Sequence, residues 1–188
     1  MAAIYHTRTI SRHEIDDKLK KSGDFVKLDF LSSCLKKQMD FDTKKFVLLK
    51  LAELYSERKM FAEAGKMMRA GAEINGTYEG KMNDFIKSGE LFAKAGNFDE
   101  ADVSFTKALG SATEMQRAKI KTAKKTAYFA KAKELMQRDR RSHAMEAYEK
   151  LLLMDLNPIE KHEVQNALLQ IYEKLGKVKE FYALKAGM

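Results

Sequence analysis

The amino-acid sequence predicts an all-α fold, and three observations carry that prediction. A single proline, Pro158, interrupts the 188 residues. Ile, Val and Thr together number only 21, whereas sheet proteins use these β-branched residues much more often. Apolar residues recur at steps of three and four, as at Leu48, Leu51 and Tyr55, so they share one face of a helix.

Short breaks that contain Gly or Asn divide the chain into helices of about 12 to 16 residues. Helices of this length are marginally stable alone, so each must pack against its neighbours. We therefore expect one domain over residues 13–188, with residues 1–12 loosely ordered. The predicted helical hairpins span about residues 13–38, 43–74, 80–110, 114–155 and 159–186.

An internal repeat justifies each hairpin in order. The first hairpin carries a degenerate copy, the second and third carry full copies, the fourth a further copy and the fifth a truncated one. The residues that begin each second helix in the same register are Leu28, Ala64, Ala101, Ala144 and Phe181. Their intervals are 36, 37, 43 and 37 residues, so one insertion lies before the fourth copy.

Close packing of the two helices in a hairpin explains this spacing. A small residue such as Ala64 or Ala101 lets antiparallel helices approach, and Phe105 or Tyr148 one turn later fills the remaining space. Gly96 relieves the tight turn between the helices of the third hairpin, because glycine has no Cβ to clash there.

Three segments carry a resemblance to a known family. The segments Leu51-Ala52-x2-Tyr55, Gly96-Asn97-Phe98-Asp99-Glu100-Ala101 and Phe105-x2-Ala108 resemble the tetratricopeptide repeat, and the resemblance covers about residues 14–185. The signature tryptophan is absent, Pro158 lies about two positions late, and the repeat exceeds the usual length of about 34 residues. The longer spacing is similar to the soluble NSF attachment protein branch of helical repeats.

The resemblance implies a right-handed α-α superhelix, or solenoid, of four to five antiparallel hairpins. Its concave groove would bind a peptide or helix of a partner protein. In the family's register the groove residues would be Leu49, Glu53, Asn83, Ile86, Glu90, Phe129, Lys133, Asn166 and Gln170.

The character of these groove residues favours one kind of partner. Exposed Leu49, Ile86 and Phe129 would suit an amphipathic helix or a short linear motif. The alternative is that these three side chains pack against the next hairpin. The Lys/Asn pattern that clamps a terminal carboxylate in some tetratricopeptide proteins is not reproduced, which disfavours a chaperone-tail ligand.

Catalytic motifs are absent from the sequence. It contains no phosphate-binding glycine loop, no nucleophile elbow and no H-E-x-x-H zinc motif. The four histidines are dispersed, and the single cysteine, Cys34, lies among leucines and is expected to be a buried thiol. We therefore expect no enzyme activity, no cofactor and no metal.

Positive charge gathers in one segment. The chain has a formal net charge of +8, and residues 117–141, with ten cations and two acids, account for all of it. The insertion would extend the helix here about two turns beyond its hairpin. An anion-binding ridge would use Arg117, Lys119, Lys121, Lys124, Lys125, Arg138, Arg140 and Arg141.

The predicted function is a protein-protein interaction adaptor, and two alternatives concern the basic segment. It could bind the phosphates of RNA or DNA without reading their sequence, or it could be a solvated face that keeps the protein soluble. No stretch is apolar enough for a transmembrane helix or a secretory signal, so a cytoplasmic location is expected. The sequence leaves monomer and dimer both open.

Overall fold

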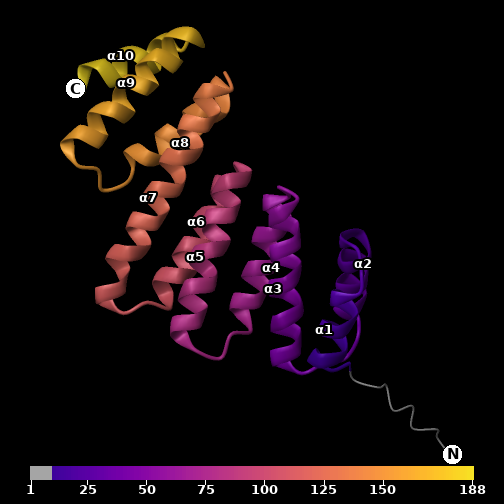
Figure 1. The fold of residues 1–188 in the computed structure, drawn as a ribbon. Helices are drawn as coiled ribbons and strands as arrows, with labels where there is room; N and C mark the ends of the chain where they lie inside the picture. Colours follow the sequence, from indigo (N-terminus) through magenta and orange to yellow (C-terminus); the bar gives the residue numbers. More distant parts are fainter. Residues whose placement is uncertain (1–9) are drawn as a thin grey trace, which may run out of the picture.

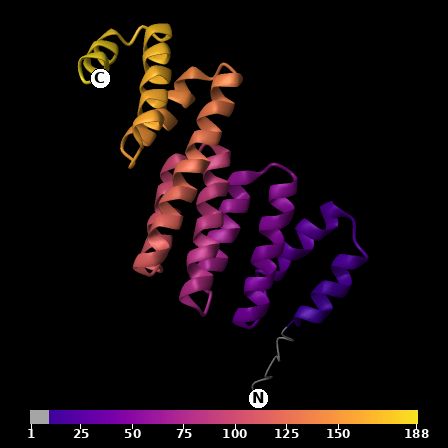
Figure 2. The same cartoon turned by 60° about the vertical axis from the view of Figure 1, so that its left-hand side comes forward.

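The computed structural model describes residues 10–188, which form ten α-helices and no strand (Figure 1). The prediction of an all-α helical-repeat solenoid is confirmed. Five hairpins stack side by side, with the described ends of the chain at opposite ends of the stack (Figures 1 and 2). The helices are α1 (Arg12–Lys20), α2 (Asp24–Cys34), α3 (Phe41–Glu57), α4 (Phe61–Glu73), α5 (Tyr78–Ala95), α6 (Phe98–Gly110), α7 (Glu114–Gln137), α8 (Arg141–Leu152), α9 (Pro158–Lys174) and α10 (Val178–Ala186).

In most hairpins a side chain caps the N-terminus of the first helix. The Asp40 carboxylate accepts a hydrogen bond of 2.8 Å from the Thr43 backbone N–H at the start of α3. Asn157 and Glu160 form a reciprocal capping box at the start of α9, where Pro158 takes the first helical position. Residues 1–9 of the segment expected to be loosely ordered lie outside the described residues, and Ser11 caps α1.

The turn inside each of the last four hairpins places one residue in the left-handed region. These residues are Lys59, Gly96, Asp139 and Gly176, with φ of 59°, 83°, 56° and 66°. They are 37, 43 and 37 positions apart, which are the intervals of the sequence repeat. Glycine adopts this conformation without steric cost, whereas lysine and aspartate adopt it under strain.

Replacing Lys59 by glycine should therefore stabilise the protein. The Lys59→Gly change removes the left-handed strain but adds chain entropy to the unfolded state, so we expect a net gain of about 0.5 kcal/mol in the free energy of unfolding. Urea unfolding checks this value. The matched Gly96→Ala change should lower the free energy of unfolding by about 1 kcal/mol, and a gain there would contradict the turn geometry.

Two apolar clusters form the core. The smaller one joins α1, α2 and α3 and includes Ile15, Leu31 and Val47. The larger one runs from the end of α4 to α9, with Phe92, Tyr128 and Leu168 among its buried members. Each hairpin therefore buries its apolar face against the next hairpin, as repeat proteins do.

Small residues bring α4, α5 and α6 into close contact. The Ser88 hydroxyl of α5 donates a hydrogen bond of 2.9 Å to the Gly65 carbonyl of α4, and it lies 3.0 Å from the Ser104 hydroxyl of α6. A Cβ added to Gly89 would lie 2.7 Å from the Phe105 ring. This side of α5 therefore fits its neighbours only because it carries no large side chain.

Ion pairs join the second helices of successive hairpins. Arg69 of α4 pairs with Glu100 of α6, and Lys107 of α6 pairs with Glu73 of α4. Lys150 of α8 lies 2.8 Å from both Asp99 and Asp102 of α6. None of the described helices is long and apolar enough to span a membrane.

Candidate partner-binding groove

The first helices of the third and fourth hairpins enclose a hollow of about 630 Å³, called here the α5–α7 hollow. Three alanines of α7, Ala123, Ala127 and Ala130, lie along it at steps of four and three, which places them on one face of the helix. From Ala123 to Glu134 the lined part of α7 covers about three helical turns. A floor of such small side chains leaves room for bulky ones from a partner.

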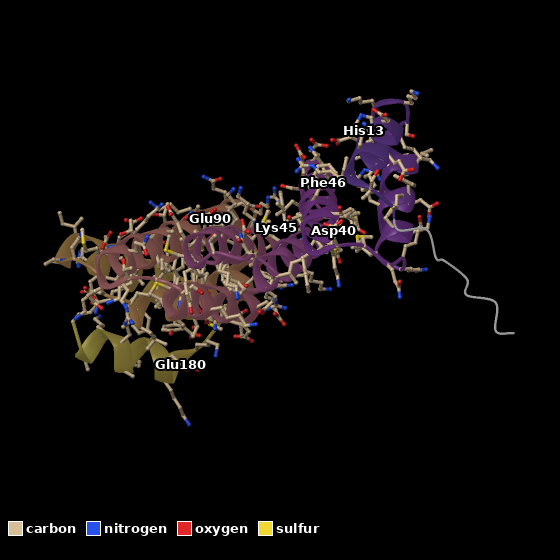
Figure 3. The ribbon with its side chains drawn as sticks, turned by 90° about the horizontal axis from the view of Figure 1, so that it is seen from below. His13, Asp40, Lys45, Phe46, Glu90 and Glu180 are labelled. Carbon is tan, nitrogen blue, oxygen red and sulfur yellow. The ribbon has the colours of Figure 1, made fainter. Side chains whose placement is uncertain are left out.

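Charged side chains stand at the edges of the α5–α7 hollow. Lys131 and Glu134 of α7 pair with each other at 3.3 Å. The ammonium of Lys94 of α5 lies 6.0 Å from the centre of the Phe61 ring of α4, which also lines the hollow. Glu90 projects from the middle of the solenoid, far from Glu180 near its C-terminal end (Figure 3). The hollow thus offers an apolar floor between cationic and anionic groups.

A second hollow of about 460 Å³, the α7–α9 hollow, lies between the first helices of the last two hairpins. It is more polar, with Gln137, Asn166 and Gln170 contributing amides that can both donate and accept hydrogen bonds. Lys133 of α7 pairs with Glu163 of α9 at 2.9 Å, and the hydrogen bond with Glu163 raises the pKa of Lys133.

Four of the nine residues predicted to line the groove lie in these two hollows. Glu90 lines the α5–α7 hollow, and Lys133, Asn166 and Gln170 line the α7–α9 hollow. Glu53 lies in a different hollow between the first two hairpins, where Lys50 holds its carboxylate at 2.8 Å. These positions therefore remain a prediction that binding experiments must test.

The expectation of three exposed apolar side chains in the groove needs correction. Ile86 is only 7% exposed and belongs to the large core cluster, so it cannot contact a partner. Leu49 is half-buried, with its Cδ2 3.5 Å from the position that a Cβ on Gly71 would take, so it faces α4. Phe129 packs against the core, and Asn83 is half-buried. Ile86 and Phe129 are therefore packed in the core and not exposed in a groove, whereas Leu49 packs within its own hairpin.

The α5–α7 hollow also contains residues that the sequence reasoning misses. Ala123, Ala127 and Ala130 were not among the predicted groove residues, which on this helix were only Phe129 and Lys133. The four-and-three spacing of the alanines, next to the core positions Tyr128 and Ala132, is the signal that could have found them.

The basic segment is largely neutralised by ion pairs. Seven of its ten cations contact carboxylates: Arg117, Lys124, Lys125, Lys131, Lys133, Arg138 and Arg141. Lys119, Lys121 and Arg140 make no ion pair with any residue in the range 10–188. A nucleic acid would have to displace these carboxylates before its phosphates could pair with the seven cations. Only the three unpaired cations are directly available to phosphates.

One network anchors the long helix α7. The Tyr128 hydroxyl donates toward Asp102, 2.7 Å away, and also lies 2.9 Å from the Phe98 carbonyl oxygen. Lys124 contacts the same Asp102 carboxylate at 2.6 Å. Burial opposes ionisation of Asp102, but hydrogen bonds from Lys124, Lys150 and Tyr128 outweigh it and lower its pKa. Burial and the hydrogen bond to Asp102 raise the pKa of Tyr128.

The side chains considered for chemistry do not form a site. Cys34 is buried in the small core cluster, and burial raises the pKa of its thiol, which keeps it in the unreactive form. His143 and His162 are exposed on α8 and α9. Within the described part of the chain no three His, Cys, Asp or Glu residues are placed to hold a metal ion.

Comparison with known proteins finds one family whose pattern matches part of the chain. The family described as tetratricopeptide repeat matches residues 126–158, which span the second half of α7 and all of α8. No curated protein matches the chain. Solved structures similar to it include the crystal structure of BtubC (BKLC) from P. vanneervenii, at 16% identity over 91% of this chain and 74% of that one, with a TM-score of 0.38.

Proposed function

We propose that this tetratricopeptide-like helical-repeat protein is a non-catalytic adaptor that holds a helix or short linear motif of a partner protein in the α5–α7 hollow. Tetratricopeptide repeats generally mediate protein–protein interaction, and the family generally consists of scaffolds without catalytic activity. The observation that carries the proposal for this chain is the alanine floor of the hollow, bordered by charged groups of both signs.

The shape of the hollow favours a helical ligand. Helices pack closely where one of them presents small residues and the other presents bulky ones, so a partner helix could place Leu, Met or Phe side chains over Ala123, Ala127 and Ala130. The lined length of about three turns suits three or four such anchor residues. Lys94 and Glu90 would fix the direction of the helix by pairing with its charged side chains.

Filling the hollow should abolish partner binding. Ala130 is exposed, so an Ala130→Arg change leaves the core intact while placing a long side chain on the floor. We expect affinity capture from cells that express the protein to recover a partner with the wild type and to lose it, at least about tenfold, with Ala130→Arg.

A matched change controls for surface charge. Ala186→Arg places the same side chain on an exposed position of α10, outside the hollow, and should leave capture unchanged. Retention of every captured protein by Ala130→Arg would refute the proposed site. Loss of the same proteins by both variants would show that added positive charge, and not the hollow, controls binding.

A further inference from the structure

One buried tyrosine has a hydroxyl without a partner inside the described protein. Tyr128, Tyr148 and Tyr172 are buried, with 0%, 4% and 7% of their surface exposed. The Tyr128 hydroxyl donates a hydrogen bond of 2.7 Å to Asp102. The Tyr172 hydroxyl donates one of 3.0 Å to Glu149. The Tyr148 hydroxyl makes no hydrogen bond to any described residue, although a buried tyrosine usually has such a partner.

The Tyr148 hydroxyl opens into the α7–α9 hollow. Tyr148 belongs to α8, which packs against both α7 and α9 (Figure 1), and it lines the hollow between those two helices. Every fully buried side-chain oxygen and nitrogen of the described residues has a hydrogen-bond partner, so this unpartnered hydroxyl must reach the surface. Burial raises the pKa of Tyr148, the Glu163 carboxylate raises it further, and Lys133 lowers it. Both charged groups line the same hollow, which places the hydroxyl beside it.

The lining of the α7–α9 hollow carries no net charge. Its two charged residues, Lys133 and Glu163, pair with each other at 2.9 Å. Its other polar groups are the amides of Gln137, Asn166 and Gln170, which make no hydrogen bond within the described part of the chain. An amide both donates and accepts hydrogen bonds. The hollow therefore suits an uncharged ligand that offers donors and acceptors of its own.

The spacing of two amides matches the main chain of an extended peptide. Asn166 and Gln170 are one turn apart on α9, a rise of about 6 Å. Alternate residues of an extended chain are about 6.6 Å apart, and their main-chain N–H and C=O groups point to the same edge. A helix would offer few such groups, because its own hydrogen bonds occupy them. The unpartnered groups of the hollow therefore fit an extended chain better than a helix.

We propose that the α7–α9 hollow holds an extended, uncharged segment of a partner protein by its main chain. The Tyr148 hydroxyl would bond one peptide group, and Asn166 and Gln170 would bond two others along the same edge. Met136 and Ala167, which also line the hollow, would contact a small side chain of the segment. The proposal concerns a different hollow from the one between α5 and α7, and the two can fail separately.

Three short peptides test this proposal on the full chain. The first contains only Ser and Thr and has both ends blocked, the second is its copy with a methyl group on every main-chain nitrogen, and the third carries Glu at alternate positions. NMR of the isotope-labelled protein at about 150 mM salt measures binding from the shifts of α7 and α9. A carbon label in the tyrosine rings reports a new hydrogen bond to Tyr148. We expect the Ser/Thr peptide to bind with a Kd of about 1 mM and to shift the Tyr148 signal.

The other two peptides separate main-chain recognition from charge. The methylated peptide lacks main-chain donors, so it should bind at least about tenfold more weakly. The Glu peptide should bind no more tightly than the Ser/Thr peptide, because Glu163 already holds Lys133. Equal binding of the methylated peptide, tighter binding of the Glu peptide, or no binding of the Ser/Thr peptide at about 10 mM would each overturn the proposal.

Two matched tyrosine variants test the role of the hydroxyl. Tyr148→Phe should weaken binding of the Ser/Thr peptide about three- to tenfold and leave Tm unchanged, because this hydroxyl has no partner among residues 10–188. Tyr172→Phe removes a hydroxyl that is bonded to Glu149, so it should lower Tm and leave peptide binding unchanged. Unchanged peptide binding by Tyr148→Phe, or a fall in Tm equal to that of Tyr172→Phe, would contradict the assignment.

Further variants locate the bound peptide. Asn166→Ala and Gln170→Ala should each weaken binding of the Ser/Thr peptide at least about threefold, and the fold should tolerate both changes because the two side chains are exposed. Ala130→Arg fills the α5–α7 hollow and should leave binding of this peptide unchanged. Loss of binding by Ala130→Arg, with full binding by Asn166→Ala and Gln170→Ala, would place the peptide in the α5–α7 hollow and overturn the proposal.

Discussion

A Gly89→Ala substitution is expected to destabilise the protein by about 2 kcal/mol, although alanine is the better helix former. The added Cβ would lie 2.7 Å to 2.9 Å from atoms of the Phe105 ring, a distance that real Cβ atoms do not tolerate. Because Phe105 is only 1% exposed and packed on all sides, the ring has little room to move. Thermal unfolding should show a decrease of about 4 to 8 °C in Tm.

Two controls separate packing from helix propensity. Gly110, the last residue of α6, has open space around the position of a Cβ, so Gly110→Ala should be neutral or slightly stabilising. Adding Phe105→Leu to Gly89→Ala should cost less than the sum of the two single changes, because the smaller side chain relieves the contact. Strict additivity would contradict the close approach of α5 and α6.

An Asp102→Asn substitution is expected to lower the free energy of unfolding by about 1 to 2 kcal/mol at pH 7. It removes the charge that holds Lys124 of α7 and Lys150 of α8, which lie 2.6 Å and 2.8 Å from the carboxylate. This expected loss is smaller than for a fully buried ion pair because the Asp102 side chain is 32% exposed. Urea unfolding measures the loss.

The effect of Asp102→Asn should depend on pH in one direction. The folded state lowers the pKa of Asp102, so its charge stabilises the protein above the unfolded pKa of about 3.9 and ceases to do so as the pH falls through the lowered folded value. The difference between wild type and Asp102→Asn should therefore shrink in acid. Asp155→Asn, at an exposed carboxylate without an ion pair among residues 10–188, should show little difference at any pH.

The sequence predicted the parts of the fold that depend on local spacing. Alanine at Ala64 and Ala101 and apolar residues every three or four positions are set by close packing between neighbouring helices, so they repeat along the chain. The insertion that lengthens α7 could be predicted for the same reason, because it changes the interval between equivalent residues.

The groove could be predicted only in part, because its residues depend on contacts between hairpins. Whether Ile86 is exposed depends on how closely α5 and α7 approach, which the spacing within one hairpin does not determine. The same limit applies to the basic segment. Its partners Asp102 and Glu160 are more than twenty residues away from Lys124 and Lys125, so only the folded chain shows the pairing.

Photocrosslinking from position 130 tests the central claim most directly. A photoreactive phenylalanine analogue replaces Ala130 on the floor of the α5–α7 hollow, and a second sample carries it at Ala186, an exposed position of α10 outside the hollow. The proposed function predicts that position 130 crosslinks to one short segment of a captured partner and that position 186 does not. Equal crosslinking from both positions, or crosslinks from position 130 scattered over many unrelated proteins, would contradict it.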